Sequence, residues 1–317
     1  MKHQQLALPV EDARVLNIAS TYTSGEAVCL YHGNCLDLLH QVELSGDKAQ
    51  LVITSPPYNV GKEYERPMPL EEYVEDQRQT IKACVDILAE SGSICWQVGH
   101  YIHGSGKDKE AFPLDLVLYP VFKSFGLTLK NRVVWQFGHG LHETFRFSGR
   151  HETLLWFTRC ANDYVFNLDP IRIPQKYPGK RSYRGDKKGK PSGNPKGKNP
   201  TDVWDMPNVK SNHPEKTEHP CQFPVGLVER MLLATTNPND LVVDPYMGVG
   251  TTAIAAVKHQ RRVAGADIEE RYLNIAEDRL VAFQNGTLQT RPMNEPLYVP
   301  DGRTSVSRVP DEWLISK

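Results

Sequence analysis

Short apolar runs alternate along this chain with longer stretches in which apolar residues recur every three or four positions. The runs at residues 50–53 and 93–98 are rich in β-branched and other apolar residues, which is typical of buried strands. Between them, apolar side chains from Val74 to Leu88 fall on one helical stripe, and Ser91-Gly92 is predicted to end that helix. A strand, a helix and a second strand in this order form the parallel crossover unit of an α/β sheet.

The same alternation recurs on both sides of this unit. Further strands are predicted at residues 27–31, 128–137, 153–157, 241–243 and 262–266, and helices at residues 36–42, 114–125, 224–232, 273–283 and from 251 onward. Residues 1–26, 100–108, 160–218 and those beyond 286 lack a regular pattern and are expected to be irregular. The chain therefore predicts an α/β fold: a mostly parallel, twisted sheet with helices on both faces and an irregular insertion.

Bulk composition places the chain among ordinary globular proteins. Its 317 residues are 39% hydrophobic and 24% charged, which suits one large domain or one domain with a smaller insertion. No apolar run approaches the roughly 20 residues that cross a bilayer, and the first residues lack the apolar core of a secretory signal. We therefore expect a cytoplasmic protein without a membrane partner. The six cysteines are scattered without a Cys-x-x-Cys pair, so we expect reduced thiols and no metal site.

The net charge of −1 conceals one strongly basic segment. Between Arg172 and Lys198 there are ten lysines and arginines and a single acid, Asp186. This asymmetry is compatible with an enzyme body that carries an insertion facing a polyanion. A solvated charged loop is the simpler alternative.

The stretch Thr54-Ser55-Pro56-Pro57-Tyr58 follows the strand at residues 50–53. Two consecutive prolines end the strand's hydrogen-bond ladder, which leaves backbone carbonyls unpaired at the edge where open α/β sheets bind ligands. The serine adds a side-chain acceptor and the tyrosine adds a flat ring. Together these groups suit a planar substrate with an exocyclic amino group. A rigid turn with a packed tyrosine, or a proline-rich ligand segment, would have the same sequence pattern.

A second stretch, Asp244-Pro245-Tyr246-Met247-Gly248-Val249-Gly250-Thr251-Thr252, joins a predicted strand to a predicted helix. Its two glycines permit a tight turn and a close approach of backbone to ligand. Nineteen residues after Gly248 stands Asp267, the position from which a carboxylate binds ribose hydroxyls. The third glycine of the dinucleotide fingerprint is missing, and no Gly-Lys-Ser/Thr follows, which excludes a phosphate-binding P-loop. The arrangement favours an adenosine-containing cofactor over a glycine-rich turn with a solvated Asp267.

Taken together, the two stretches resemble those of the amino-group DNA methyltransferases that use S-adenosylmethionine. The catalytic motif precedes the cofactor motif and a long insertion separates them, as in the beta class of bacterial modification enzymes. The resemblance covers residues 27–283 and implies a Rossmann-like methyltransferase fold with permuted motif order. It divides the chain into an N-terminal arm (1–26), a catalytic half (27–159), a target-recognition insertion (160–218), a cofactor-binding half (219–285) and a tail (286–317).

The resemblance also implies roles for individual residues. Ser55 and the Pro56 carbonyl would accept hydrogen bonds from the target amino group, Pro57 would keep the turn rigid, and Tyr58 would stack on the base. Asn34 stands where the family usually has aspartate. The expected cofactor contacts are Asn34, Cys35, His219, Pro220, Phe223, Asp244, Pro245, Tyr246, Gly248, Gly250, Thr251 and Asp267. The expected DNA contacts are Lys180, Arg181, Tyr183, Arg184, Lys187, Lys188 and Trp204.

The expected activity is in-line methyl transfer to the amino group of a base flipped out of double-stranded DNA. Family members with serine at the position of Ser55 are mostly cytosine-N4 enzymes, so cytosine N4 is favoured. Adenine N6 is the main alternative, because both bases present the same N–H geometry. Methylation of RNA or of a protein amide, and a non-catalytic DNA-binding role, are further alternatives. We expect a monomer or homodimer, with any restriction endonuclease acting separately.

Overall fold

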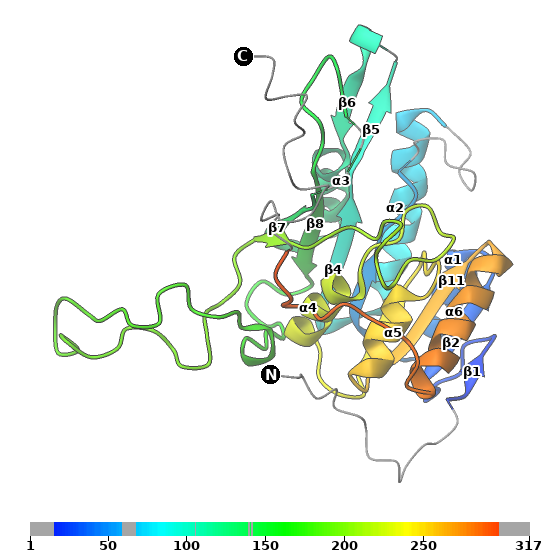
Figure 1. Ribbon diagram of the computed structural model, residues 1–317. Coiled ribbons are helices and arrows are strands. Elements are labelled where there is room, and N and C mark those ends of the chain that lie inside the picture. Colours follow the sequence, from blue (N-terminus) through cyan, green and yellow to red (C-terminus); the bar gives the residue numbers. More distant parts are fainter. Residues whose placement is uncertain (1–15, 59–67, 105, 139, 141, 298–317) are drawn as a thin grey trace.

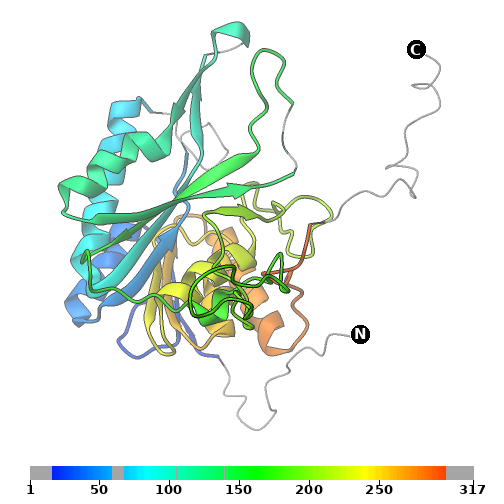
Figure 2. The ribbon, with the colours of Figure 1, turned by 90° about the vertical axis from the view of Figure 1, so that its left-hand side faces the viewer.

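A nine-stranded sheet forms the centre of this computed structural model, which describes residues 16–58, 68–104, 106–138, 140 and 142–297 (Figure 1). The strand order is β1-β2-β11-β10-β3-β4-β8-β7-β9, and β8 is antiparallel to both of its neighbours while the other pairings are parallel. The expected mostly parallel, twisted sheet is confirmed (Figure 2). The strands are β1 (Ile18–Ala19), β2 (Val28–His32), β3 (Ala49–Thr54), β4 (Leu88–Val98), β7 (Thr128–Gln136), β8 (His151–Thr158), β9 (Val203–Asp205), β10 (Leu241–Asp244) and β11 (Arg262–Asp267).

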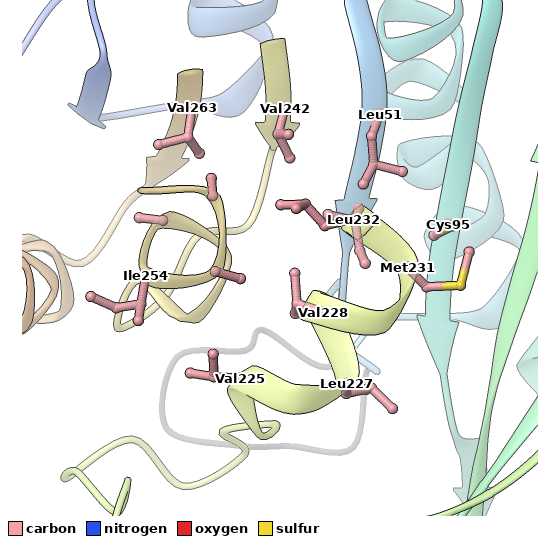
Figure 3. Packing of buried hydrophobic residues seen from close by; sticks show 14 of the residues in the cluster. Leu51, Cys95, Val225, Leu227, Val228, Met231, Leu232, Val242, Ile254 and Val263 are labelled. Carbon is pink, nitrogen blue, oxygen red and sulfur yellow. The ribbon is translucent and has the colours of Figure 1, made fainter. Parts of the chain in front are cut away.

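Helices cover both faces of this sheet, as expected (Figure 2). One face carries α1 (Cys35–Ser45), α2 (Leu70–Ile87) and α3 (Leu114–Ser124), and the other carries α4 (Val225–Thr235), α5 (Thr251–Lys258) and α6 (Glu270–Gln284). Alternate strand residues supply the two hydrophobic cores. In Figure 3, Val228 and Leu232 of α4 lie with Leu51 and Val242 of the sheet, and all four are fully buried. Burial of one such side chain stabilises the fold by roughly 1.5–3 kcal/mol.

The boundary between α2 and β4 differs from the prediction. Leu88 is the first residue of β4, not the last of the helical stripe, and Ser91-Gly92 lies inside that strand. Ala49 pairs with Leu88 while Leu51 pairs with Ser93, so the residues between Leu88 and Ser93 form an irregularity in the ladder. A Cβ at Gly92 would come within 2.8 Å of the Ala89 carbonyl oxygen, so glycine serves this bulge and not a helix end.

The predicted loop at residues 100–108 is largely a β-hairpin. Strands β5 (His100–His103) and β6 (Glu110–Pro113) pair antiparallel, with the short helix η2 (Gly106–Asp108) near the turn. Tyr101 packs against Phe112 at 5.9 Å between ring centroids. Each of these strands has only four residues, and only some of them are apolar. The alternation of apolar and polar residues that indicates a strand is therefore too weak to be recognised in the sequence.

Residues 160–218 are less irregular than predicted. They contain the short helix η3 (Asp169–Ile171) and strand β9, which adds to the sheet beside β7. Residues 172–202, which connect η3 to β9, form a long loop that extends away from the sheet (Figure 1). We refer to this loop as the excursion. Residues 18–19 of the expected N-terminal arm form β1, whereas residues 1–15 and 298–317 of the arm and tail lie outside the described residues. None of the described helices is both long enough and apolar enough to span a membrane.

Candidate active site

The two motifs meet at the carboxyl ends of β3 and β10, which are neighbours in the sheet. From β3 the chain crosses to β4 on one side, and from β10 it crosses to β11 on the other. Ligands of open α/β sheets bind at such a switch point. A cavity of about 240 Å³ opens there. The predicted site residues that line it are Asn34, Cys35, Ser55, Pro56, Pro57, Tyr58, His219, Phe223, Pro245, Tyr246, Gly248, Thr251 and Asp267.

On the β3 side, Ser55 and Tyr58 are joined through their hydroxyl groups. Ser55 Oγ lies 3.0 Å from Tyr58 Oη, and Tyr58 Oη donates to Glu152 Oε2 at 3.4 Å. Gln97 donates a short hydrogen bond to the same Glu152 oxygen. Burial, with the nearby Glu152 carboxylate, holds the pKa of Tyr58 well above its ordinary value, so the phenol stays protonated. This turn therefore presents a rigid aromatic ring beside a serine oxygen.

Asp244 is buried and does not line the cavity, so its direct cofactor contact stays a prediction. Its carboxylate accepts hydrogen bonds from Thr54 Oγ1 and Thr252 Oγ1, both at 2.5 Å, and from the Tyr246 amide at 3.1 Å. Burial raises the pKa of Asp244 to about 6 despite these donors. The residue ties the loop after β10 to β3 and α5, so its part in the site is to position the loop.

The two glycines of the second motif have different uses. Gly248 (φ 52°) donates its amide to Asp267 Oδ2 at 2.8 Å at the edge of the cavity. Gly250 (φ 75°) does not line the cavity, contrary to expectation. A Cβ on Gly250 would lie 2.6 Å from Ala276 Cβ, so this glycine lets α5 begin against α6. Both glycines are in the left-handed region, but only the first lines the cavity.

Opposite the glycine turn, α1 and α2 close the cavity. Asn34 Oδ1 accepts from the Leu36 amide at 2.9 Å, so the amide that replaces the usual aspartate caps α1. Tyr246 Oη lies 3.1 Å from Thr80 Oγ1 and accepts from Gln77 Nε2 at 3.2 Å, which anchors the second motif to α2. The wall is therefore held by hydrogen bonds between elements distant in sequence.

The segment before α4 forms a third wall. The His219 ring packs edge-on against Tyr272 at 4.5 Å, and its Nδ1 accepts from the Cys221 amide at 3.2 Å. Pro220 is exposed and does not line the cavity, and its cofactor contact stays a prediction. Other lining residues were not among the individually predicted contacts, and some of them lie within the same motifs while others lie on neighbouring elements. They are Gly33, Leu36, Asp76, Thr80, Cys221, Gln222, Met247, Val249, Ile268, Glu269 and Tyr272.

The predicted DNA contacts divide into two groups. Trp204 is only 6% exposed, packs in the core, donates its indole N–H to the Thr201 carbonyl at 2.7 Å and lies beneath the Arg230 guanidinium. Its indole packs in the core and is not exposed with the other predicted contacts, which argues against a contact with a base edge. The others are exposed on the excursion, away from the cavity lining, and their contact with DNA stays a prediction. They are Lys180, Arg181, Tyr183, Arg184, Lys187 and Lys188.

Comparison with known proteins identifies the family. The family described as DNA methylase, with N6 and N4 methyltransferases as members, matches residues 49–278. The chain belongs to this family. Type II methyltransferase M.BglII of Bacillus subtilis is 47% identical over 260 residues, which cover 82% of this chain and 71% of M.BglII. DNA adenine methyltransferase YhdJ of Escherichia coli (strain K12) is 29% identical over 266 residues, which cover 82% of this chain and 85% of YhdJ. The solved structure of the cytosine-N4-specific PvuII DNA methyltransferase shares the fold, with a TM-score of 0.60 and 18% identity over 84% of this chain and 94% of that chain.

This DNA methylase therefore acts on an amino group of DNA, and its cofactor is S-adenosylmethionine. The residues of the cavity fit that cofactor. Asp267 Oδ1 and Oδ2 each accept one backbone amide, from Glu269 and Gly248, and a carboxylate oxygen can accept a further hydrogen bond from a ribose hydroxyl. Ile268, 64% exposed at the cavity, is an apolar side chain that would offer a packing surface to an adenine ring.

Proposed function

We propose that this protein methylates the N4 amino group of cytosine in double-stranded DNA. The observation that carries the proposal is Ser55, whose Oγ stands at the end of β3, 3.0 Å from Tyr58 Oη, in the wall of the cavity. In the resembling enzymes, serine at this position goes mostly with cytosine N4. The fold shared with the cytosine-N4-specific PvuII enzyme is compatible with this proposal.

Adenine N6 is the alternative acceptor, and one relationship favours it. YhdJ, 29% identical to this chain, is a DNA adenine methyltransferase. Cytosine and adenine both carry an exocyclic amino group next to a ring nitrogen, so an acceptor such as Ser55 can serve either base. Identification of the methylated nucleoside distinguishes the two.

The chain's own groups can direct the target nitrogen. An exocyclic amino nitrogen is a poor nucleophile because its lone pair is delocalised into the ring. Acceptance of its two N–H bonds by Ser55 Oγ and the Pro56 carbonyl favours a pyramidal nitrogen whose lone pair points out of the ring plane. Tyr58 stacks on the base and Pro57 keeps the turn rigid, so alignment and electrostatic stabilisation lower the barrier. The cofactor supplies an electrophilic methyl group on a sulfonium centre.

The basic excursion supplies the contact with the duplex in this proposal. Exposed lysines and arginines between Arg172 and Lys198 would neutralise phosphates, which gives salt-dependent affinity. Residues 160–218 would contain the target-recognition part. Any partner restriction endonuclease would act separately, and the methylase would work as a monomer or homodimer.

Methyl transfer to defined acceptors tests the proposal. The purified protein is incubated with methyl-labelled S-adenosylmethionine and, in parallel, with duplex DNA, RNA and protein. Nucleosides from the DNA are then identified by mass spectrometry, and N4-methylcytosine is the expected product. Ser55→Ala and Tyr58→Ala should bind the cofactor and lose most of the transfer. N6-methyladenine alone would establish the alternative, and preferred transfer to RNA or protein would overturn the assignment to DNA.

A further inference from the structure

Glu152 is the second residue of β8 and contacts the catalytic turn through Tyr58, and neither motif contains it. We propose that Glu152 accepts, through Tyr58 and Ser55, the proton that the target amino group loses after methylation. The proposal rests on methyl transfer to an amino group, and it holds for cytosine and for adenine alike. It makes Glu152 a positioning residue that acts through Tyr58, because its carboxylate lies behind the tyrosine and outside the cavity lining.

Three side-chain oxygens lie in series from the cavity inward. Ser55 Oγ is 3.0 Å from Tyr58 Oη, and Tyr58 Oη is 3.4 Å from Glu152 Oε2. Either hydroxyl of the first pair can act as donor, so a proton can pass in the direction of the carboxylate. The series begins at the atom that accepts the target N–H and ends at a carboxylate.

The surroundings hold this series in place. Gln97 of β4, only 3% exposed, donates a short hydrogen bond to Glu152 Oε2. On the same strand end, a Cβ at Gly99 would lie 3.2 Å from Tyr58 Cε2, so the backbone fits closely behind the tyrosine ring. Both the carboxylate and the phenol therefore keep their orientation when a base enters the cavity.

A buried carboxylate at this place carries a desolvation penalty, which indicates that its negative charge has a role. A glutamine could hold the Tyr58 hydroxyl with a smaller desolvation penalty. Burial raises the pKa of Glu152 to about 7, although its bonds from Gln97 and Tyr58 and the charge of Lys210 act in the opposite direction. The other titratable groups around Tyr58 are Cys221 and Tyr73. A base with this pKa is half ionised near neutral pH and can both take up and release a proton.

The proton transfer balances without another reactant. Once the new nitrogen–carbon bond has formed, the amino nitrogen carries one positive charge and one proton more than the product. That proton passes to Ser55 Oγ, the serine proton passes to Tyr58 Oη, and the tyrosine proton passes to Glu152 Oε2. Both hydroxyls end neutral, and the carboxylate becomes a neutral carboxylic acid that later loses the proton to water. The negative carboxylate also stabilises the positive charge that develops on the nitrogen.

The test compares single-turnover methylation by wild type and Glu152→Gln between pH 5.5 and 9. The wild-type rate should fall about tenfold per pH unit below a pH near 7, where Glu152 becomes protonated, and stay level above it. Glu152→Gln keeps the shape and an acceptor for the tyrosine, but should be roughly 10- to 100-fold slower at pH 8 with no acid limb. Glu152→Asp should recover part of the rate together with the acid limb.

Binding measurements separate this role from a structural one. Glu152→Gln should keep the wild-type affinity for duplex DNA and the wild-type fluorescence rise when 2-aminopurine at the target position is flipped out. Tyr58→Phe should lose the acid limb too, and the double variant should be no slower than the slower single variant. A wild-type pH profile in Glu152→Gln, or additive losses in the double variant, would overturn the relay. If Glu152→Gln does not fold, the pH profile of Tyr58→Phe decides alone. Failure of wild type to methylate any amino group would instead refute the proposed function.

Discussion

Thr54 and Asp244 are joined by a buried hydrogen bond of 2.5 Å between Thr54 Oγ1 and Asp244 Oδ1. The two residues are 190 positions apart in the chain, and they end the neighbouring strands β3 and β10. Each is the first residue of one of the two motifs, since Ser55 follows Thr54 and Pro245 follows Asp244. This pair of side chains therefore links the turn that carries Ser55 to the loop that follows β10, at the switch point of the sheet.

Replacement of Thr54 by valine, which has the same shape, should weaken this link. The loss leaves a buried carboxylate with one donor fewer and should lower the free energy of unfolding by about 1–3 kcal/mol. Thr252→Val is the matched control, because it removes the other threonine donor to Asp244 but leaves β3 untouched. Both variants should lose stability in denaturant titrations, and only Thr54→Val should also slow methyl transfer at saturating substrates. Equal methylation rates in the two variants would show that the link does not position Ser55.

Asp244 should make the stability of the fold depend on pH. Its folded pKa of about 6 lies above the ordinary value near 4, so the folded state binds the proton more tightly than the unfolded state. Its contribution is fully present below pH 4 and is lost as the pH rises through 6. Asp244→Asn removes this titration, so the stability difference between wild type and variant should move in favour of the variant by about 2 kcal/mol between pH 4 and pH 7. Urea unfolding at a series of pH values measures it, and a pH-independent difference would contradict the assignment.

Much of this arrangement could be predicted from the sequence because each motif is one continuous stretch of residues with strong backbone preferences. Two prolines after a β-branched run and a Gly-x-Gly before a helix dictate turns at strand ends, and parallel strands bring such ends to one edge. The motif sequences do not predict the direction in which each side chain points. Asp244 and Gly250 look like cofactor contacts in the motif, yet one is buried beneath the loop and the other packs on α6.

Other features depend on contacts across the sheet that a single segment does not reveal. Trp204 lies in a basic, proline-rich stretch, but pairing of β9 with β7 buries it. Glu152 was missed because the predicted strand began at residue 153, and its partners Gln97 and Tyr58 are 55 and 94 residues away. An acid at the start of a strand on the ligand-binding edge was the available signal.

The two glycines of the second motif should respond differently to alanine. Gly250→Ala combines left-handed strain of about 1–2 kcal/mol with overpacking of about 1–3 kcal/mol against Ala276, so it should destabilise the whole fold. In Gly248→Ala the added Cβ makes only ordinary contact, 3.5 Å from His219 Nε2, and only the strain remains. That methyl group enters the cavity wall, so cofactor affinity should fall about tenfold while most stability is retained. Thermal unfolding and calorimetric titration with S-adenosylmethionine distinguish the two, and the reverse order of effects would contradict the assignment of Gly250 to packing.

Trp204 should matter for stability and not for base recognition. Trp204→Ala removes a buried indole beneath Arg230 and should cost about 3–5 kcal/mol. Trp204→Phe keeps most of the buried area and should cost less. Under conditions where both variants are folded, their preference for the methylated site over other sequences should equal that of wild type, as measured by competition binding. A weaker preference of Trp204→Phe for the methylated site than that of wild type would show that Trp204 contacts DNA.

The basic excursion should act through its charge. Lys187 and Lys188 are exposed there, and each phosphate that they neutralise releases counterions from the duplex. The double substitution Lys187→Ala with Lys188→Ala should therefore reduce the slope of log affinity against log salt concentration by about 2 and weaken cognate and non-cognate duplexes alike. The control is Lys82→Ala on α2, which removes an exposed lysine paired with Asp86 at 2.6 Å. An unchanged slope in the double variant, or an equal change in Lys82→Ala, would remove the excursion from the DNA interface, because contact with phosphate cannot leave the salt dependence unaltered.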